Sequence, residues 1–209
     1  MTRTRDPSSH VAAGLSVMAI VEEALSVIAE RGVAGLTMSA LADRLGVRSP
    51  SLYHHVRDKA ELLDLVAREP FGTFTTDRDA YDEVASVDEW IALTSSGTLR
   101  LRDFYASHPG LAALVQATAT PNRDQGTGSR ASLVAAQIRA LIRLGVSEPQ
   151  ARETFQACAR WTLAAVAAED HVAGGRDDAL FRRGLEWLLY GVRADLVHMI
   201  AAASVKSEN

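Results

Sequence analysis

The sequence has very little cysteine and no long hydrophobic run. Its 209 residues include one cysteine, Cys158, which excludes an intrachain disulfide and a zinc site built from several thiolates. A membrane-spanning helix needs roughly 18 or more apolar residues in succession, and no such stretch occurs. Glu22 and Glu23 interrupt the apolar stretch near the N-terminus, so we expect no signal peptide. A cytoplasmic protein with no membrane partner is the simplest expectation.

The sequence also lacks an excess of positive charge. It carries 22 Lys and Arg against 26 Asp and Glu, a formal net charge of −4. Residues 1–68 hold eight of each sign, so the whole deficit (14 − 18 = −4) lies in residues 69–209. A neutral N-terminal part can still present a basic face, and an acidic remainder avoids nonspecific contact with phosphates. Composition therefore permits nucleic-acid binding without requiring it.

Helical periodicity dominates the chain, and strict alternation long enough for a strand is missing, so the fold class is all-α. The expected helices cover residues 15–31, 37–45, 49–55, 58–68, 88–107, 111–117, 130–144, 148–169 and 179–203. Residues 70–87 break the periodicity and are expected to form a hinge or loop. Residues 1–14 are polar and predict a flexible N-terminal arm.

Start and stop signals between residues 37 and 58 predict a helix-turn-helix. Thr37 caps a short helix that Gly46 closes, and Ser49 followed by Pro50 begins a second short helix. Asp58 then caps a longer helix. In such a unit the N-terminal end of the second helix projects short side chains into the major groove of DNA.

This segment resembles the DNA-binding domain of the TetR (tetracycline-repressor) family of bacterial transcriptional regulators. The matching motifs are Leu36-Thr37, Leu41-Ala42, Leu45-Gly46-Val47, Leu52-Tyr53, His55-Val56, Lys59 and Leu62-Leu63. The resemblance covers about residues 15–68 and implies an N-terminal three-helix helix-turn-helix DNA-binding domain there. It also implies a C-terminal helical domain for ligand binding and dimerisation over residues 69–209.

The resemblance further implies two groups of DNA-contacting side chains. Phosphates would be contacted by Thr37, Tyr53, His55 and Lys59. Bases would be faced by Ser39, Arg48, Ser49, Pro50, Ser51 and His54. The tetracycline repressors have arginine at the position of Ser39 and tryptophan at that of His54, so we expect a different operator.

Other interpretations of the same residues remain open. The adjacent His54 and His55 could signal a metal or acid–base site, but the only nearby candidate partner, Asp58, suits a helix cap better. Tyr53 could be a half-buried core aromatic. The chain has no nucleophile elbow, no phosphate-binding glycine loop and no convincing carboxylate pair. We therefore expect no enzymatic activity, no cofactor and no metal.

The last two expected helices are too apolar for a single buried face, which favours a four-helix interface with a second copy. The residues expected in this interface are Trp161, Leu185, Leu188, Leu189, Val192 and Leu196. The alternative is that both are simply central core helices of one copy.

An effector pocket is expected from apolar walls mixed with a few hydrogen-bonding groups. Its candidate residues are Trp90, Phe104, Gln116, Thr118, Gln137, Phe155 and Trp161. The tetracycline repressors bind a magnesium–drug chelate through a histidine, and an ungapped comparison puts Val115 at that position. Valine offers no donor to a hard cation, so we expect a largely apolar organic effector without metal.

The sequence as a whole predicts a homodimeric repressor that binds double-stranded operator DNA and is released by a small-molecule effector. The alternative is a small-molecule-binding or protein-interaction module with a vestigial DNA-binding head.

Overall fold

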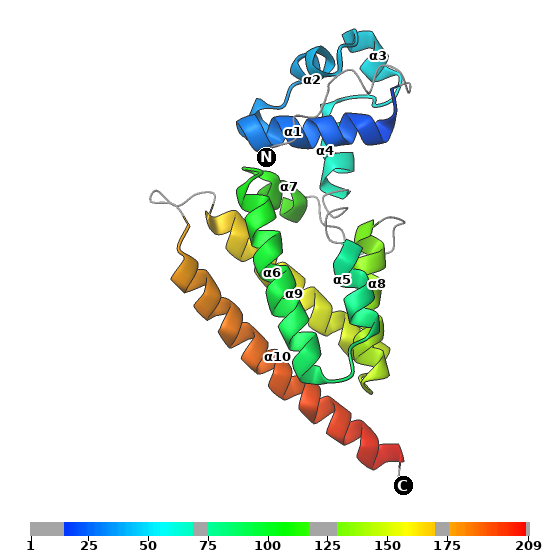
Figure 1. Cartoon of the computed structure of the whole chain (residues 1–209), viewed down its shortest axis with the longest axis vertical. Coiled ribbons are helices and arrows are strands. Elements are labelled where there is room, and N and C mark those ends of the chain that lie inside the picture. The colour runs from blue at the N-terminus through cyan, green and yellow to red at the C-terminus, as the bar shows by residue number, and fades with distance from the viewer. Residues whose placement is uncertain (1–14, 69–74, 118–128, 170–175, 208–209) are drawn as a thin grey trace.

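The computed structural model describes residues 15–68, 75–117, 129–169 and 176–207, and all regular structure in these ranges is α-helical (Figure 1). The helices form a small head, α1 to α4, and a larger body, α5 to α10. Their bounds are α1 Val17–Gly35, α2 Met38–Leu45, α3 Ser49–Tyr53, α4 Lys59–Arg68, α5 Thr75–Asp82, α6 Val87–Ala106, α7 Leu111–Ala117, α8 Ser129–Arg143, α9 Glu148–Glu169 and α10 Asp178–Ser207. The predicted all-α class with an N-terminal helix-turn-helix is confirmed.

The head is held by one apolar cluster to which all four of its helices contribute. Ile28 of α1, Leu41 of α2, Leu52 of α3 and Leu62 of α4 are all completely buried in it. On the surface, Arg44 of α2 donates to carboxylates of α1 and so ties the two helices together. This packing fixes the orientation of α3 relative to the rest of the head.

The predicted helix boundaries in the head hold to within a few residues; α3, for example, ends at Tyr53 instead of residue 55. The Thr37 hydroxyl caps α2 by accepting from the Ala40 N–H at 3.1 Å, and Gly46 closes that helix in the left-handed region at φ 67°. The N-cap of α3 is Arg48, one residue before the expected Ser49, and no side chain caps this helix. At the expected end of α1, Gly32 makes a kink at φ 68°, after which one more turn continues.

The expected loop over residues 70–87 is wrong for part of its length, because α5 occupies residues 75–82. This short helix is mostly polar and therefore shows almost no apolar periodicity. It is held by Tyr81, which is buried, and by Arg143 of α8, which donates to the Tyr81 carbonyl at 2.7 Å. Tertiary contacts with α8 and α6, rather than local pattern, stabilise α5.

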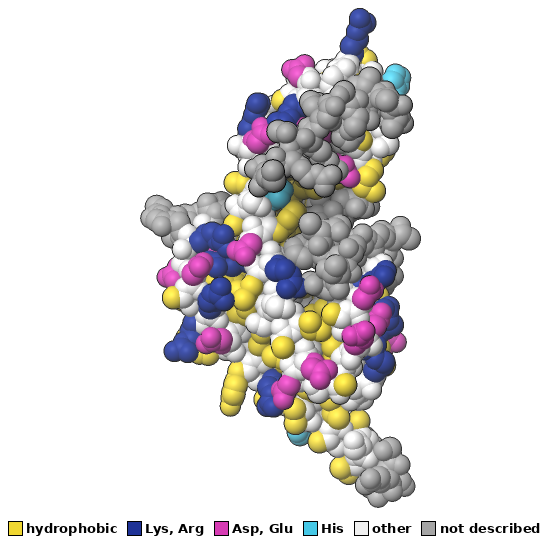
Figure 2. Space-filling view, in the orientation of Figure 1, with side chains coloured by type: hydrophobic (Ala, Val, Ile, Leu, Met, Phe, Trp, Pro, Cys, Tyr) yellow, Lys and Arg dark blue, Asp and Glu magenta, His cyan; other side chains and the backbone are white. Residues whose placement is uncertain are grey.

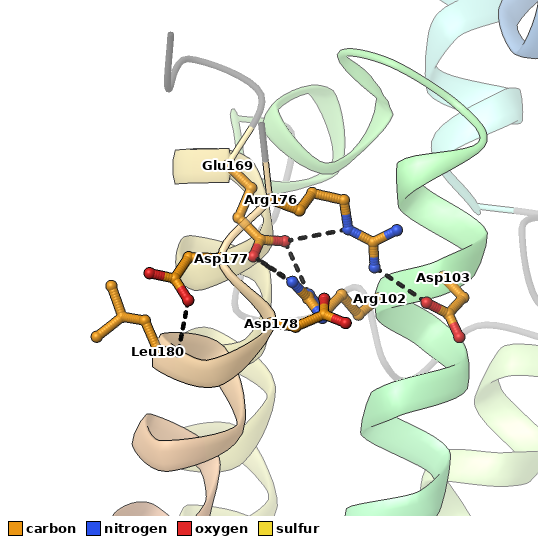
Figure 3. A network of polar contacts seen from close by, with 7 residues as sticks. All are labelled: Arg102, Asp103, Glu169, Arg176, Asp177, Asp178 and Leu180. Atoms are coloured by element: carbon orange, nitrogen blue, oxygen red, sulfur yellow. Dashed lines mark hydrogen bonds and ion pairs between the residues drawn. The ribbon is translucent and has the colours of Figure 1, made fainter. Parts of the chain in front are cut away.

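A buried arginine joins three helices of the body (Figure 3). Arg102 of α6 has a side chain only 3% exposed, and it donates to Glu169 at the end of α9 and to Asp178 at the start of α10. Its guanidinium also lies 4.5 Å from the centre of the Phe181 ring. Arg176 extends the network to Glu169 and Asp103.

The head meets the body where α1 kinks against the turn between α6 and α7. The Val33 N–H donates to the Pro109 carbonyl at 3.0 Å, a backbone bond between the two parts. Two glycines permit the approach: a Cβ on Gly32 would lie 3.3 Å from the Pro109 oxygen, and one on Gly110 would lie 3.3 Å from the Val33 Cβ. Both glycines also have positive φ, which disfavours any other residue. We call this contact the glycine joint.

Helix α10 runs along one edge of the body and projects beyond it (Figure 1). Of the residues predicted for a dimer interface, Leu185, Leu189 and Leu196 are buried within the chain, whereas Trp161, Leu188 and Val192 are half-buried. A second set of apolar side chains on α10 stays exposed. This set, called the outer face, comprises Leu180, Trp187, Tyr190, Val197 and Val205.

Helix α10 is also long and apolar enough, by length and composition, to cross a membrane. Helices of soluble proteins pass the same test, so this property alone is weak evidence. The most apolar stretch of α10 is only 11% buried inside the chain, and its exposed apolar side chains need another explanation.

Candidate DNA-binding surface and effector cavity

The surface expected to contact DNA lies at the free end of the head, on α2, α3 and the start of α4 (Figure 1). The helix-turn-helix places most of the predicted side chains outward. Exposed are Thr37, Ser39, Arg48, Pro50, Tyr53, His54 and His55, and half-buried are Ser49, Ser51 and Lys59. Leu52 and Val56 point the other way and are buried in the core. The helix therefore separates packing residues from residues available to a partner.

Tyr53 and the two histidines illustrate this separation. Tyr53 is 51% exposed, so it is not a core aromatic. His54 and His55 are exposed as well, and no cluster of three potential metal-ligating side chains occurs in the part of the chain that the structure describes. The Thr37 hydroxyl serves as the cap of α2, and it remains on the surface where a phosphate could also reach it.

The positive charges of the head are divided between structural and available ones. Arg44 is engaged by Glu23 and Glu30, and its hydrogen bond holds the pKa of Glu30 below the usual range. Arg57 pairs with Glu61 at 3.2 Å. Arg48 and Lys59 make no ion pair with any described residue, so their charges stay free for phosphates or base edges. In Figure 2 a basic side chain protrudes at the free end of the head, with a histidine near it.

A cavity of about 780 Å³, counting its solvent-open mouth, lies in the body between α5, α6, α8 and α9. Mostly apolar walls with a few polar groups are typical of small-molecule sites. The lining is Tyr81 of α5; Thr94, Gly97, Thr98, Leu101 and Tyr105 of α6; Leu133, Val134 and Gln137 of α8; and Phe155, Cys158, Ala159, Thr162 and Leu163 of α9. Helix α6 contributes one face, because these positions recur at three- and four-residue steps.

The polar groups of the cavity wall are mostly hydroxyls. Tyr81 and Thr94 hydrogen-bond to each other through their hydroxyls at 3.1 Å, and the Thr162 hydroxyl donates to the Cys158 carbonyl at 2.8 Å. Burial raises the pKa of the Cys158 thiol to about 11. The thiol is therefore protonated at neutral pH and acts as a small apolar wall element.

The predicted pocket residues fall into three groups. Gln137 and Phe155 line the cavity. Trp90, Phe104, Gln116 and Trp161 are not among its lining residues, and Thr118 lies outside the described residues. Trp90 is fully buried and donates its indole N–H to the Gln137 carbonyl at 3.1 Å, so it fixes α6 against α8 beside the cavity. Trp161 packs on Phe181, and Gln116 is exposed.

Sequence reasoning missed the hydroxyl residues that line the cavity. Thr94 and Thr98 are four residues apart on the buried side of α6, and Thr162 is similarly buried on α9. The available signal was a polar residue repeated on the otherwise apolar face of a helix. Alone, that signal does not distinguish a cavity from a satisfied core.

The fold and the exposed recognition helix define a helix-turn-helix DNA-binding protein. The model of the "Bacterial regulatory proteins, tetR family" matches residues 20–66. An HTH-type transcriptional regulator from Saccharopolyspora erythraea is 30% identical over 176 residues, which are 84% of this chain and 70% of the relative. The class A tetracycline repressor of transposon 1721 from Escherichia coli is 28% identical over 173 residues, 81% of this chain and 76% of the relative.

Solved structures show the same architecture over most of the chain. BioQ with its double-stranded DNA operator is 26% identical with a TM-score of 0.61, covering 87% of this chain and 99% of that one. The Q116A variant of TetR from Acinetobacter baumannii in complex with minocycline gives a TM-score of 0.68 at 24% identity, covering 85% and 96%. The chain belongs to the TetR family, and it is a DNA-binding transcriptional regulator rather than an enzyme.

Proposed function

We propose that this regulator is a cytoplasmic homodimeric repressor that leaves its operator when a small, largely apolar organic molecule occupies the body cavity. The observation that carries the proposal is that α6 connects the cavity to the head. One face of this helix lines the cavity, and its C-terminal end leads directly into the turn that bonds to α1. A conformational change at the cavity can therefore be transmitted to the head through α6, which is a rigid element. A structural neighbour was solved in complex with minocycline, which supports a small-molecule ligand for this fold.

The DNA-contacting residues of the proposal are those predicted from the sequence. Arg48 and His54 would face bases from α3, while Tyr53, His55 and Lys59 would hold the helix on phosphates. Their exposure and the two unpaired positive charges support this role. In a dimer the two recognition helices would enter successive major grooves about 34–36 Å apart.

For the dimer interface we propose a surface centred on the outer face of α10 rather than the deeply buried part of the predicted stripe. Leu185, Leu189 and Leu196 already pack inside one chain, so they have little surface left for a second copy. Trp187 is 69% exposed and Tyr190 78%, and large aromatic side chains exposed on a helix favour a protein interface. The half-buried Trp161, Leu188 and Val192 would border it.

The experiment that tests the function uses the purified full-length protein and labelled duplex DNA from the region flanking its own gene. We expect a sequence-preferring complex whose affinity falls steeply with salt. Addition of a molecule that binds the cavity is expected to lower operator affinity by the ratio of its affinities for the two states. No preference for the flanking DNA over a scrambled duplex would contradict the proposal.

A further inference from the structure

The cavity wall contains no charged side chain among the described residues. Its fourteen members are apolar, hydroxyl-bearing or amide-bearing, apart from the protonated thiol of Cys158. Moving an ion from water into such a site costs several kcal/mol unless a counter-charge meets it. This lining therefore selects against anionic and cationic ligands.

Three arginines near the wall are engaged elsewhere. Arg102 follows Leu101 on α6, but Glu169 and Asp178 hold its guanidinium. On α8, Arg139 pairs with Asp82, and Arg143 donates to the Tyr81 carbonyl. A ligand would have to break these contacts to recruit a counter-charge from them.

Thr98 and Gln137 carry polar side-chain atoms in the wall that no other described residue engages. Thr154 and Thr162 both donate their hydroxyls to the carbonyl four residues earlier, but the Thr98 hydroxyl makes no hydrogen bond to any described residue. The side-chain amide of Gln137 is also unbonded within the described chain, although its backbone carbonyl accepts from Trp90. Both side chains line the cavity, so their donors and acceptors are available to a ligand there.

We propose that the cavity takes an uncharged effector with an apolar body and a hydroxyl or carbonyl group, bound by Thr98 of α6 and Gln137 of α8. This inference rests on the proposed function, since it specifies the ligand of the same cavity. The apolar body of the effector would contact Phe155, Leu133 and Leu163. Because Thr98 lies on α6, the bond would form on the helix that leads to the glycine joint.

Four probes that share the anthracene ring system test whether the cavity excludes charged ligands. They are anthracene, 9-(hydroxymethyl)anthracene, anthracene-9-carboxylate and 9-(aminomethyl)anthracene, and the last of these is an ammonium ion at pH 7. Binding to the full-length protein is measured by probe fluorescence, and release of labelled flanking DNA is followed in the same titration. We expect the alcohol to bind at least tenfold more tightly than either ion.

Three variants locate the bound probe and distinguish the loss of one contact from a general loss of folded structure. Thr98→Val removes the hydroxyl with little change of shape. We expect it to weaken binding of the alcohol about three- to tenfold and to leave the affinity for anthracene unchanged. Thr154→Val is the matched control, because Thr154 does not line the cavity, and both probes should bind as to wild type. Ala159→Phe fills the cavity and should abolish binding of both.

The outcomes separate this inference from the proposed function. An ion that binds as tightly as the alcohol, a Thr98→Val variant that binds the alcohol normally, or no binding by any probe overturns the inference. Release of DNA by a cavity-bound ion would overturn the inference and leave the proposed function standing. Binding of the alcohol with the expected Thr98 dependence but without DNA release would support the inference and count against the proposed function.

Discussion

Lys59 is the residue whose contribution to DNA binding can be measured most cleanly. The chain has only two lysines, Lys59 in the head and Lys206 in α10. If each copy places one Lys59 on a phosphate, Lys59→Ala is expected to weaken binding to all DNA sequences by the same factor. It should also lower the slope of log K against log salt concentration by about 2 per dimer, at about 0.9 per lost contact. Lys206→Ala should leave the slope unchanged, and an unchanged slope for Lys59→Ala would remove Lys59 from the interface.

Cys158 provides a residue-scale test of burial. Its pKa of about 11 predicts very slow reaction with a disulfide reagent at pH 8, because the thiolate is the reactive species. Since the folded-state pKa is raised above the ordinary value of 9.0, the associated stability is complete below pH 9 and is lost as pH rises towards 11. Thiol titration in buffer and in urea checks this. Equal rates in the two would show that Cys158 is not buried.

At the residue scale, the sequence predicted which side chains of α2 and α3 are exposed far better than it predicted the lining of the cavity. Residues such as Arg48 and Tyr53 follow from caps and turns that are local in sequence. The cavity residues follow from packing among four helices, which no local pattern records. Trp90 illustrates the limit, because its large size suggested a pocket wall, yet a bond to the Gln137 carbonyl makes it part of the core.

At the scale of elements, Arg102 is expected to hold α6, α9 and α10 together. Arg102→Met would leave Glu169, 14% exposed, with only the more distant Arg176 at 3.8 Å, and the free energy of unfolding should fall by about 3–5 kcal/mol. Arg152→Met removes an exposed pair with Glu148 and should cost less than about 1 kcal/mol. Urea denaturation measures both. Equal small losses would mean that the buried network contributes little.

The same network predicts a pH dependence. The hydrogen bond from Arg102 holds the pKa of Asp178 below its usual value. A lowered carboxyl pKa contributes stability above the unfolded-state pKa, near 4, and this contribution is lost as pH falls through the folded value. Wild type should therefore lose stability faster than Arg102→Met on acidification below about pH 4. Parallel curves would contradict the coupling.

The glycine joint is the element through which we expect ligand and DNA binding to communicate. Gly110→Ala would force alanine into positive φ at 81° and against Val33, so it should cost about 1–2 kcal/mol of stability and reduce ligand-driven DNA release. Gly145→Ala is the control, because Gly145 has φ 101° but lies in the turn between α8 and α9. It should lose stability while keeping release. The joint has no coupling role if both variants release DNA like wild type.

Element prediction failed where tertiary contacts decide the structure. Helix α5 has a polar sequence and is held by Tyr81 and by contacts to α8, so its local pattern resembled a loop. Helix α10 was predicted as an element, but its packing side was not. It carries apolar residues on more than one side, and periodicity alone cannot say which side packs inside the chain and which stays outside.

At the scale of the whole molecule, the outer face of α10 predicts the oligomeric state. Replacing both Trp187 and Tyr190 with aspartate should convert a dimer to a monomer, because two buried charges would face the same apolar surface of the partner. Ile142→Asp changes an exposed apolar residue of α8 and should leave the dimer intact. Sedimentation analysis at micromolar concentration distinguishes the two. A dimeric double variant would place the interface elsewhere.

The glycine joint also bears on whether the head of one regulator of this architecture can be combined with the body of another. Its central bond is between backbone groups, and the two residues that allow the approach are glycines with no side chain to match. A foreign head with glycine at the position of Gly32, and compatible contacts to α7, would therefore dock on this body without a redesigned joint. Such a chimaera would place a new operator under the control of the same effector, which makes head and body separable units for building sensors.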